Sequence, residues 1–283
     1  MKTQSSVEAG LERLTRQFGA PGRISFAAGP NDLPIVRLAS PFGSAEFTLY
    51  GAQLLTWRPI GHAPVLYLSP KAVYQPGQPI RGGIPICFPW FGAKGSYPRH
   101  GFARTCEWRL KRTSYDKEFT QIEAELLYSQ ETLRLFPHHF QARLEVTLGR
   151  KLFLEFTVLN LDEHPFDYTE ALHPYLALAD TTQATITPLD IHPGNAPIDR
   201  NIPLSPDGLL CELHDPTLKR DILIEADDCD SVQIWNPAAP LPDIPPDAHR
   251  RFLCVEPANT LAPVHLNPGE QHTLTLRLQP RLA

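Results

Sequence analysis

Four short stretches of the chain place polar side chains inside apolar strands or stiff loops. They cover residues 81–104, 170–178, 197–201 and 252–259. Within them lie four side chains that could move or hold protons: His100, His173, Asp199 and Glu256. The chain has no GxSxG motif and no cysteine in a recognisable nucleophile motif. These residue types therefore favour general acid/base chemistry over covalent acyl transfer.

The two strongest candidates each allow two interpretations. In FLCVEPAN, alternation puts Glu256 on the same strand face as Phe252 and Cys254. A carboxylate buried on that face needs a partner. If the strand instead ends before Pro257, Glu256 faces solvent. His173 is surrounded by apolar residues and fits either a core histidine that is satisfied by a carbonyl group or a catalytic histidine.

The stretch RGGIPICFPWFGAKGSYPRHGFAR, residues 81–104, suits neither a helix nor a regular strand. It begins at Arg81 and closes at Arg104. A planar guanidinium grips a phosphate or carboxylate in a fixed orientation. The two arginines therefore predict an anion clamp, with ordinary surface charges as the alternative. His100 lies in the same loop, where simple core packing is less expected.

Composition limits the classes of function. A net charge of −5 and a pI near 6.1 do not indicate binding to nucleic acid or to an anionic membrane. Five widely spaced cysteines without a CxxC motif favour neither a disulfide framework nor a zinc cluster, and they fit a reducing, cytoplasmic environment. No P-loop, GxGxxG or HExxH motif is present, so neither a nucleotide cofactor nor a metal is predicted. The chain contains no run of 18 consecutive apolar residues, so no membrane span is predicted.

From about residue 23 onward, apolar and polar residues alternate in short runs. The clearest case is FQARLEVTLGRKLFLEFTVLNLD, residues 140–162, which predicts an antiparallel hairpin. Many such runs without helical patterns between them predict an all-β fold, a large antiparallel β-sandwich. Residues 1–22 predict a short N-terminal helical extension, and residues 23–283 a single domain. The proline-rich segment 236–250 is expected to be a surface loop.

Seven stretches run in order through most of the chain: GAQLLTWRP (51–59), APVLYLSP (63–70), RGGIPICFPWFG (81–92), HGFAR (100–104), LHPYL (172–176), IWNP (234–237) and FLCVEPAN (252–259). Together they resemble the hexose-6-phosphate mutarotase branch of the aldose 1-epimerase family. The pair RGGIPICFPWFG and HGFAR is the most specific. The resemblance implies a galactose mutarotase-like β-sandwich, which agrees with the strand pattern.

The resemblance also implies an activity. The protein would interconvert the α and β anomers of a hexose 6-phosphate, with glucose 6-phosphate as the first choice, by acid/base-catalysed ring opening and closing. His173 would be the general acid at the ring oxygen and Glu256 the general base at the anomeric hydroxyl. His100 and Asp199 would hold sugar hydroxyls, and the arginine pair would bind the 6-phosphate.

The chain departs from the family around Asp199. The family pattern Asp-Arg-x-Tyr reads DRNI at residues 199–202, so Asp190 and Asp215 are alternatives for the sugar-binding aspartate. Two alternatives for the function are an aldose 1-epimerase for unphosphorylated sugars and a non-catalytic protein that binds sugar phosphates. The expected partner is a small sugar phosphate, with no cofactor and no metal, and we expect a cytoplasmic monomer.

Overall fold

The computed structural model describes residues 4–194, 197–237 and 241–282. Within these ranges the strands form three antiparallel sheets of four, six and eight strands. The four-stranded sheet follows the order β1 (Ile24–Ala28), β2 (Pro34–Ser40), β3 (Gly43–Thr48) and β4 (Gln53–Pro59).

The six-stranded sheet carries the residues of interest. Its order is β13 (Ile198–Pro203), β16 (Ser231–Asn236), β17 (Phe252–Leu266), β10 (Phe166–Leu172) and β5 (Ile86–Cys87), with β11 (Tyr175–Ala177) also paired to β17. The order of the eight-stranded sheet is β12 (Thr185–Thr187), β14 (Leu209–Asp215), β15 (Arg220–Ala226), β18 (Gln271–Leu282), β9 (Leu152–Asn160), β8 (Phe140–Leu148), β7 (Thr120–Leu127) and β6 (Arg109–Tyr115).

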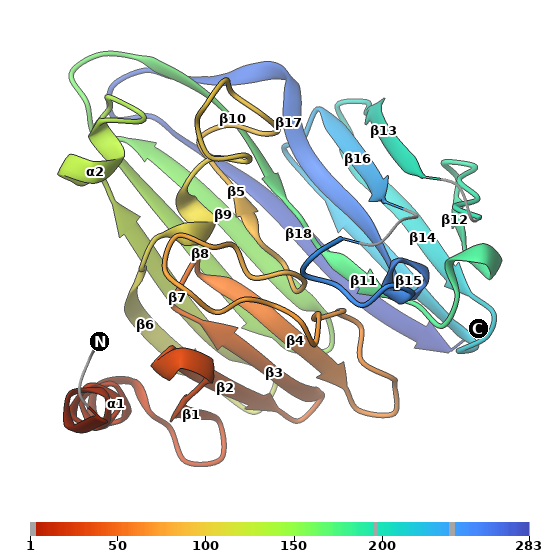
Figure 1. The fold of residues 1–283 in the computed structure, drawn as a ribbon, viewed down its shortest axis with the longest axis horizontal. Helices are drawn as coiled ribbons and strands as arrows, with labels where there is room; N and C mark the ends of the chain where they lie inside the picture. The colour runs from red at the N-terminus through yellow and green to blue at the C-terminus, as the bar shows by residue number, and fades with distance from the viewer. Residues whose placement is uncertain (1–3, 195–196, 238–240, 283) are drawn as a thin grey trace.

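The sheets pack as two layers around a hydrophobic core. Figure 1 shows the eight-stranded sheet as one broad layer, with the other two sheets lying across it. Phe47 of β3, Phe156 of β9 and Val255 of β17 are fully buried and belong to one hydrophobic cluster. The predicted all-β sandwich is therefore confirmed. It follows from strands whose apolar residues recur every second position and face a common interior.

The β8–β9 hairpin shows how the alternation determines the register. Leu148 pairs with Leu152 across the GRK turn, and Phe140 pairs with Asn160 at the far end. Along β8 every second residue is buried. A shift of one residue would turn this apolar face toward solvent, so the pattern specifies the pairing strongly.

The helical elements are few and short. The N-terminal helix α1 (Gln4–Phe18) is confirmed, and Leu14 and Phe18 pack against the main core. The hydroxyl of Thr113 on β6 donates to the carbonyl of Phe18 at 3.1 Å, which holds the end of the helix. A one-turn helix, α2 (Gln130–Leu133), lies between β7 and β8. No helix within the described residues is long and apolar enough to cross a membrane.

The loop of residues 81–104 needs glycine where it passes close to other backbone. Gly83 has φ +65°, and a Cβ there would collide with the carbonyl oxygen of Leu54. Gly101 has φ +72°, and a Cβ there would collide with the carbonyl oxygen of Phe88. Glycine is therefore required at both positions. His100, directly before Gly101, also has a positive φ of 63°, a conformation that costs a non-glycine residue free energy.

In segment 236–250, residues 241–247 form turns and bends with mostly exposed or half-exposed side chains, as expected for a surface loop. Residues 238–240 lie outside the described part, but Ile244 is only 1% exposed and packs in a cluster with Tyr175 and Phe252. A short 3₁₀ helix, Ala248–Arg251, then leads into β17. Ile244 therefore anchors the loop against the six-stranded sheet, a contact that the residue pattern did not predict.

Candidate active site

His173 and Glu256 form a buried pair at the centre of the six-stranded sheet. Nε2 of His173 lies 3.3 Å from Oε1 of Glu256. The two residues are 5% and 1% exposed. Nδ1 of His173 and Oε2 of Glu256 have no hydrogen-bond partner in the protein. Buried polar atoms normally have a hydrogen-bond partner. Because each residue of this pair has one buried polar atom without a partner, the pair is a candidate site for binding a ligand.

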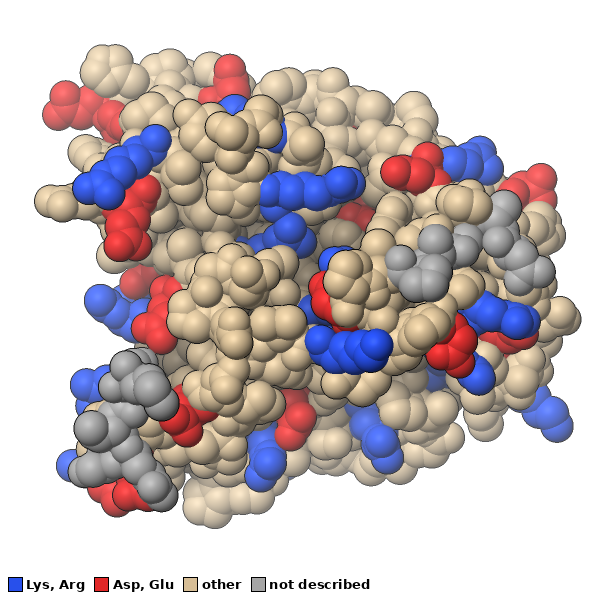
Figure 2. Space-filling model, viewed as in Figure 1, with Lys and Arg blue, Asp and Glu red and all other residues tan. Residues whose placement is uncertain are grey.

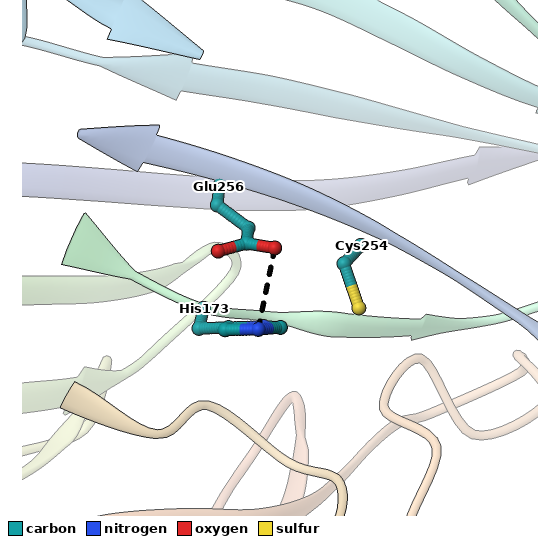
Figure 3. Close-up of side chains that lie close together, drawn as sticks. All are labelled: His173, Cys254 and Glu256. Carbon is teal, nitrogen blue, oxygen red and sulfur yellow. Dashed lines mark ion pairs between the residues drawn. The ribbon is translucent and has the colours of Figure 1, made fainter. Parts of the chain in front are cut away.

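The strand β17 brings Glu256 into this position. β17 continues through Pro257 to Leu266, so the strand does not end at the proline. Val255 belongs to the core between the sheets, whereas Cys254 belongs to a separate cluster on the other face. Glu256 follows this alternation and projects on the face of Cys254, toward His173 (Figure 3). His173 lies between β10 and β11, and its backbone N–H donates to the carbonyl of Pro85 at 3.0 Å.

The environment shifts the pKa of each residue of the pair in the direction that favours its neutral form. Burial lowers the pKa of His173 well below its ordinary value, and the nearby His100, Arg104 and Arg81 lower it further. Burial raises the pKa of Glu256 well above its ordinary value, against the opposing effect of Arg104. With both pKa shifts in this direction, the pair holds one proton at its contact, and the carboxyl group is the favoured holder. Such a pair titrates as a unit.

His100 is a buried, neutral imidazole close to the pair. The backbone N–H of Gly92 points at its Nδ1 at 3.2 Å. The Nε–H of Arg99 points at its Nε2, also at 3.2 Å. A neutral imidazole accepts at one nitrogen and donates from the other, so its tautomer decides which of the two bonds forms. Burial and the charges of Arg104, Arg99 and Arg81 lower the pKa of His100 to about 3, which keeps the ring neutral.

Three arginines, including both that the sequence predicted, act on this group of residues. Arg81 and Arg104 both lower the pKa of His173. Arg99, which the sequence reasoning missed, lowers the pKa of Glu256 together with Arg104. Nη2 of Arg104 donates to the carbonyl of Arg99 at 2.7 Å, which ties the two residues together. Basic side chains border a hollow near the centre of this face (Figure 2).

Arg81 is held by two residues that the sequence did not single out. Its Nε donates to Oδ2 of Asp243 at 2.8 Å, and its Nη1 donates to the hydroxyl of Tyr175 at 2.9 Å. The Tyr175 ring also stacks on His173, with centroids 4.8 Å apart and planes 6° from parallel. Tyr175 thus contacts both the predicted clamp and the acid/base pair. The motif LHPYL contains it, but nothing in the residue pattern predicted this double contact.

Asp199 lies on β13 at the exposed side of the site. Its Oδ1 accepts from Nε2 of Gln233 at 2.7 Å, and Gln233 is the register partner of Glu256 on β17. The Asp199 charge also raises the pKa of Glu256. The two alternative aspartates, Asp190 and Asp215, make other contacts. Asp190 pairs with a neighbouring histidine, and the buried Asp215 accepts backbone N–H bonds from residues 179 and 218.

Comparisons with known proteins identify the family of this chain. The family model for aldose 1-epimerase matches residues 34–205. A protein of Salmonella typhimurium, provisionally named a glucose-6-phosphate 1-epimerase, is 32% identical over 261 residues, which covers 82% of this chain and 85% of the relative. The chain belongs to the aldose 1-epimerase family.

Solved structures agree with the family assignment. A crystal structure of a provisionally named mutarotase from Salmonella typhimurium matches with a TM-score of 0.81 and 28% identity, over 92% of this chain and 94% of that one. A galactose mutarotase-like protein from Clostridium acetobutylicum matches with a TM-score of 0.72 over 92% and 98% of the two chains, at 14% identity. This second likeness shows the fold alone. The family and the galactose mutarotase-like fold are confirmed, while the roles of the site residues stay predictions.

Burial of the Glu256 carboxyl predicts a stability gain on its neutralisation. A carboxyl whose pKa is raised on folding stabilises the fold below its unfolded pKa of about 4.3, and this contribution is lost as the pH rises through the folded pKa. Glu256→Gln should therefore melt at a higher temperature than wild type at pH 8, by about 2 °C or more. The difference should shrink toward pH 4.5. Thermal unfolding followed by circular dichroism at several pH values measures it.

The exposed Glu163 provides the matched control. Glu163→Gln should show no comparable pH-dependent gain. A wild-type protein more stable than Glu256→Gln at pH 8 would show that His173 already balances an ionised carboxylate.

Proposed function

We propose that this aldose 1-epimerase family member interconverts the α and β anomers of glucose 6-phosphate. The observation that carries the proposal is the buried 3.3 Å contact between His173 and Glu256, within reach of three arginine charges. The relative named for the same reaction supports the choice of substrate. The contact supplies an acid and a base, and the arginines supply a place for the 6-phosphate.

The reaction needs only proton transfers. The anomeric hydroxyl O1 loses a proton, the ring oxygen gains one, and the bond between C1 and the ring oxygen breaks to give an aldehyde. Rotation about the C1–C2 bond and closure on the other face then give the opposite anomer. In our proposal Glu256 takes the proton from O1 and His173 gives one to the ring oxygen. The roles reverse during closure, so the residues return to their starting state.

The shared proton fits this cycle. Ring opening requires an imidazolium at His173 and a carboxylate at Glu256. Transfer of the shared proton from Oε1 to Nε2 across the 3.3 Å contact produces this form without a proton from solvent. The O1 hydroxyl of the sugar can donate to the carboxylate, and a hydrogen bond to the charged form favours ionisation. Substrate binding therefore offsets part of the cost of the ionic state.

The phosphate site fixes the far end of the sugar while C1 rotates. Hydrogen bonds between guanidinium and phosphate are charge-assisted and directional. Arg81 already donates from Nε and Nη1 to Asp243 and Tyr175, so these bonds hold its side chain before substrate arrives. Binding energy at C6 can then align C1 with the acid and the base. In this proposal the neutral imidazole of His100 binds a sugar hydroxyl.

Loss of either member of the buried pair should remove most of the turnover. We expect Glu256→Gln and His173→Ala each to lower kcat by about 10² to 10⁴, the usual contribution of a general acid or base. Exchange NMR of glucose 6-phosphate anomers measures kcat. Circular dichroism checks that each variant is folded. Turnover close to wild type in either folded variant would contradict the assignment.

Loss of an arginine should affect phosphorylated and free sugar differently. Arg81→Ala, Arg99→Ala and Arg104→Ala should each raise KM for glucose 6-phosphate by about 10- to 100-fold, since a hydrogen bond to a charged group contributes about 1.5–3 kcal/mol. KM for glucose should change little. The exposed Arg109 on β6 is the matched control, and Arg109→Ala should leave both KM values unchanged. Equal changes for the two sugars would contradict the clamp.

A further inference from the structure

The acid/base pair has a third neighbour that the proposed reaction does not use. Cys254 lies two residues before Glu256 on β17 and projects on the same face (Figure 3). It is fully buried. One donor atom from each of His173, Cys254 and Glu256 lies within 4.8 Å of the other two. Among the described residues, no other group of three His, Cys, Asp or Glu side chains is identified with donor atoms this close.

We infer that His173, Cys254 and Glu256 form a binding site for a thiophilic divalent cation such as Zn²⁺, and that the bound cation inhibits the enzyme. The three donors are an imidazole nitrogen, a thiolate sulfur and a carboxylate oxygen, which is a typical ligand set for Zn²⁺. Three protein ligands leave the fourth position of a tetrahedral zinc ion for a water or a substrate atom, as in catalytic zinc sites.

The distances allow such a site with small movements. Zinc bonds of about 2.0–2.3 Å at tetrahedral angles place donor atoms roughly 3.3–3.7 Å apart. The contact between His173 Nε2 and Glu256 Oε1 is already 3.3 Å. The largest separation, at most 4.8 Å, needs to close by about 1 Å.

The charges also match. Burial raises the pKa of the Cys254 thiol and of the Glu256 carboxyl group, so metal binding would release one proton from each to solvent. The resulting thiolate and carboxylate carry two negative charges, which a divalent cation neutralises inside a buried site. The carboxylate has an unpaired oxygen, Oε2, that a metal could also engage. The charges of Arg81, Arg99 and Arg104 act on the same residues and oppose a cation. The thiolate of Cys254 is therefore important for affinity, because soft sulfur ligands bind Zn²⁺ or Cd²⁺ in preference to the harder Mg²⁺.

Inhibition follows from the identity of the ligands. The lone pairs that would hold the metal are those that accept protons in the proposed reaction. A bound cation therefore prevents both the base and the acid from acting, and it should compete with the sugar. This consequence rests on the proposed function, whereas the binding site itself does not.

The test uses purified, reduced protein that has been treated with EDTA. Addition of Cd²⁺ should produce the ultraviolet thiolate-to-metal charge-transfer band at one metal per chain in wild type. Cys254→Ala should lack the band. Cys106→Ser, which changes a partly exposed cysteine outside the site, should keep it. Cys254→Ser is the second variant if the alanine protein does not fold.

Activity is measured in parallel by anomer exchange of glucose 6-phosphate. Zn²⁺ should inhibit wild type and Cys106→Ser competitively, EDTA should restore activity, and Mg²⁺ should have no effect. Cys254→Ala should be active, with a zinc concentration for half-inhibition at least about tenfold higher, since even indirect partners of a ligand change metal affinity by about 10–100-fold.

The possible results separate the two proposals. A band that is absent from wild type, or equal in wild type and Cys254→Ala, would overturn the metal site. Loss of activity on EDTA treatment with recovery on Zn²⁺ would overturn the inhibitory role. A band that depends on Cys254 in a protein without anomer exchange would support the metal site and refute the proposed function.

Discussion

The burial of one histidine against one glutamate is the constraint on which the rest of the site depends. Removal of a carboxylate and an imidazolium from water is costly, and the 3.3 Å contact offsets this cost by sharing one proton between them. The sandwich makes the burial possible because both faces of β17 are covered. Val255 faces the core between the sheets, and Cys254 faces a second hydrophobic cluster with Tyr175 on the other side. Neighbouring side chains of such a strand point into two different buried environments, so a reactive carboxyl group can follow directly after a residue of the apolar core.

The arginines and the buried pair depend on each other. Positive charges at Arg81 and Arg104 lower the pKa of His173, and Arg104 also favours the ionised form of Glu256. A phosphate bound by the guanidinium groups would weaken both effects, so substrate and acid/base pair are electrostatically coupled. Asp243 and Tyr175 hold Arg81 in place before any ligand arrives. Such preorganisation is the usual reason that an active site lowers the stability of its own fold.

Much of the fold could be predicted from the sequence, because period-two alternation directly reflects which side chains face a core. The β8–β9 hairpin is the clearest example. The position of Glu256 could not be decided from alternation alone, since Pro257 could have ended the strand. Arg99 and Asp243 were missed because they reach the site from loops, and loop residues follow no period. The buried Ile244 likewise gave no periodic signal in a proline-rich segment.

The most direct test of this account is two-dimensional exchange NMR of glucose 6-phosphate with and without the protein, with glucose as the parallel substrate. Cross-peaks between the α and β anomeric protons report the rate of interconversion. The account predicts that the exchange rate of glucose 6-phosphate increases in proportion to protein concentration, and that equal protein accelerates glucose far less. No acceleration of glucose 6-phosphate exchange would contradict the catalytic role of the buried pair, and equal acceleration of both sugars would contradict the arginine clamp.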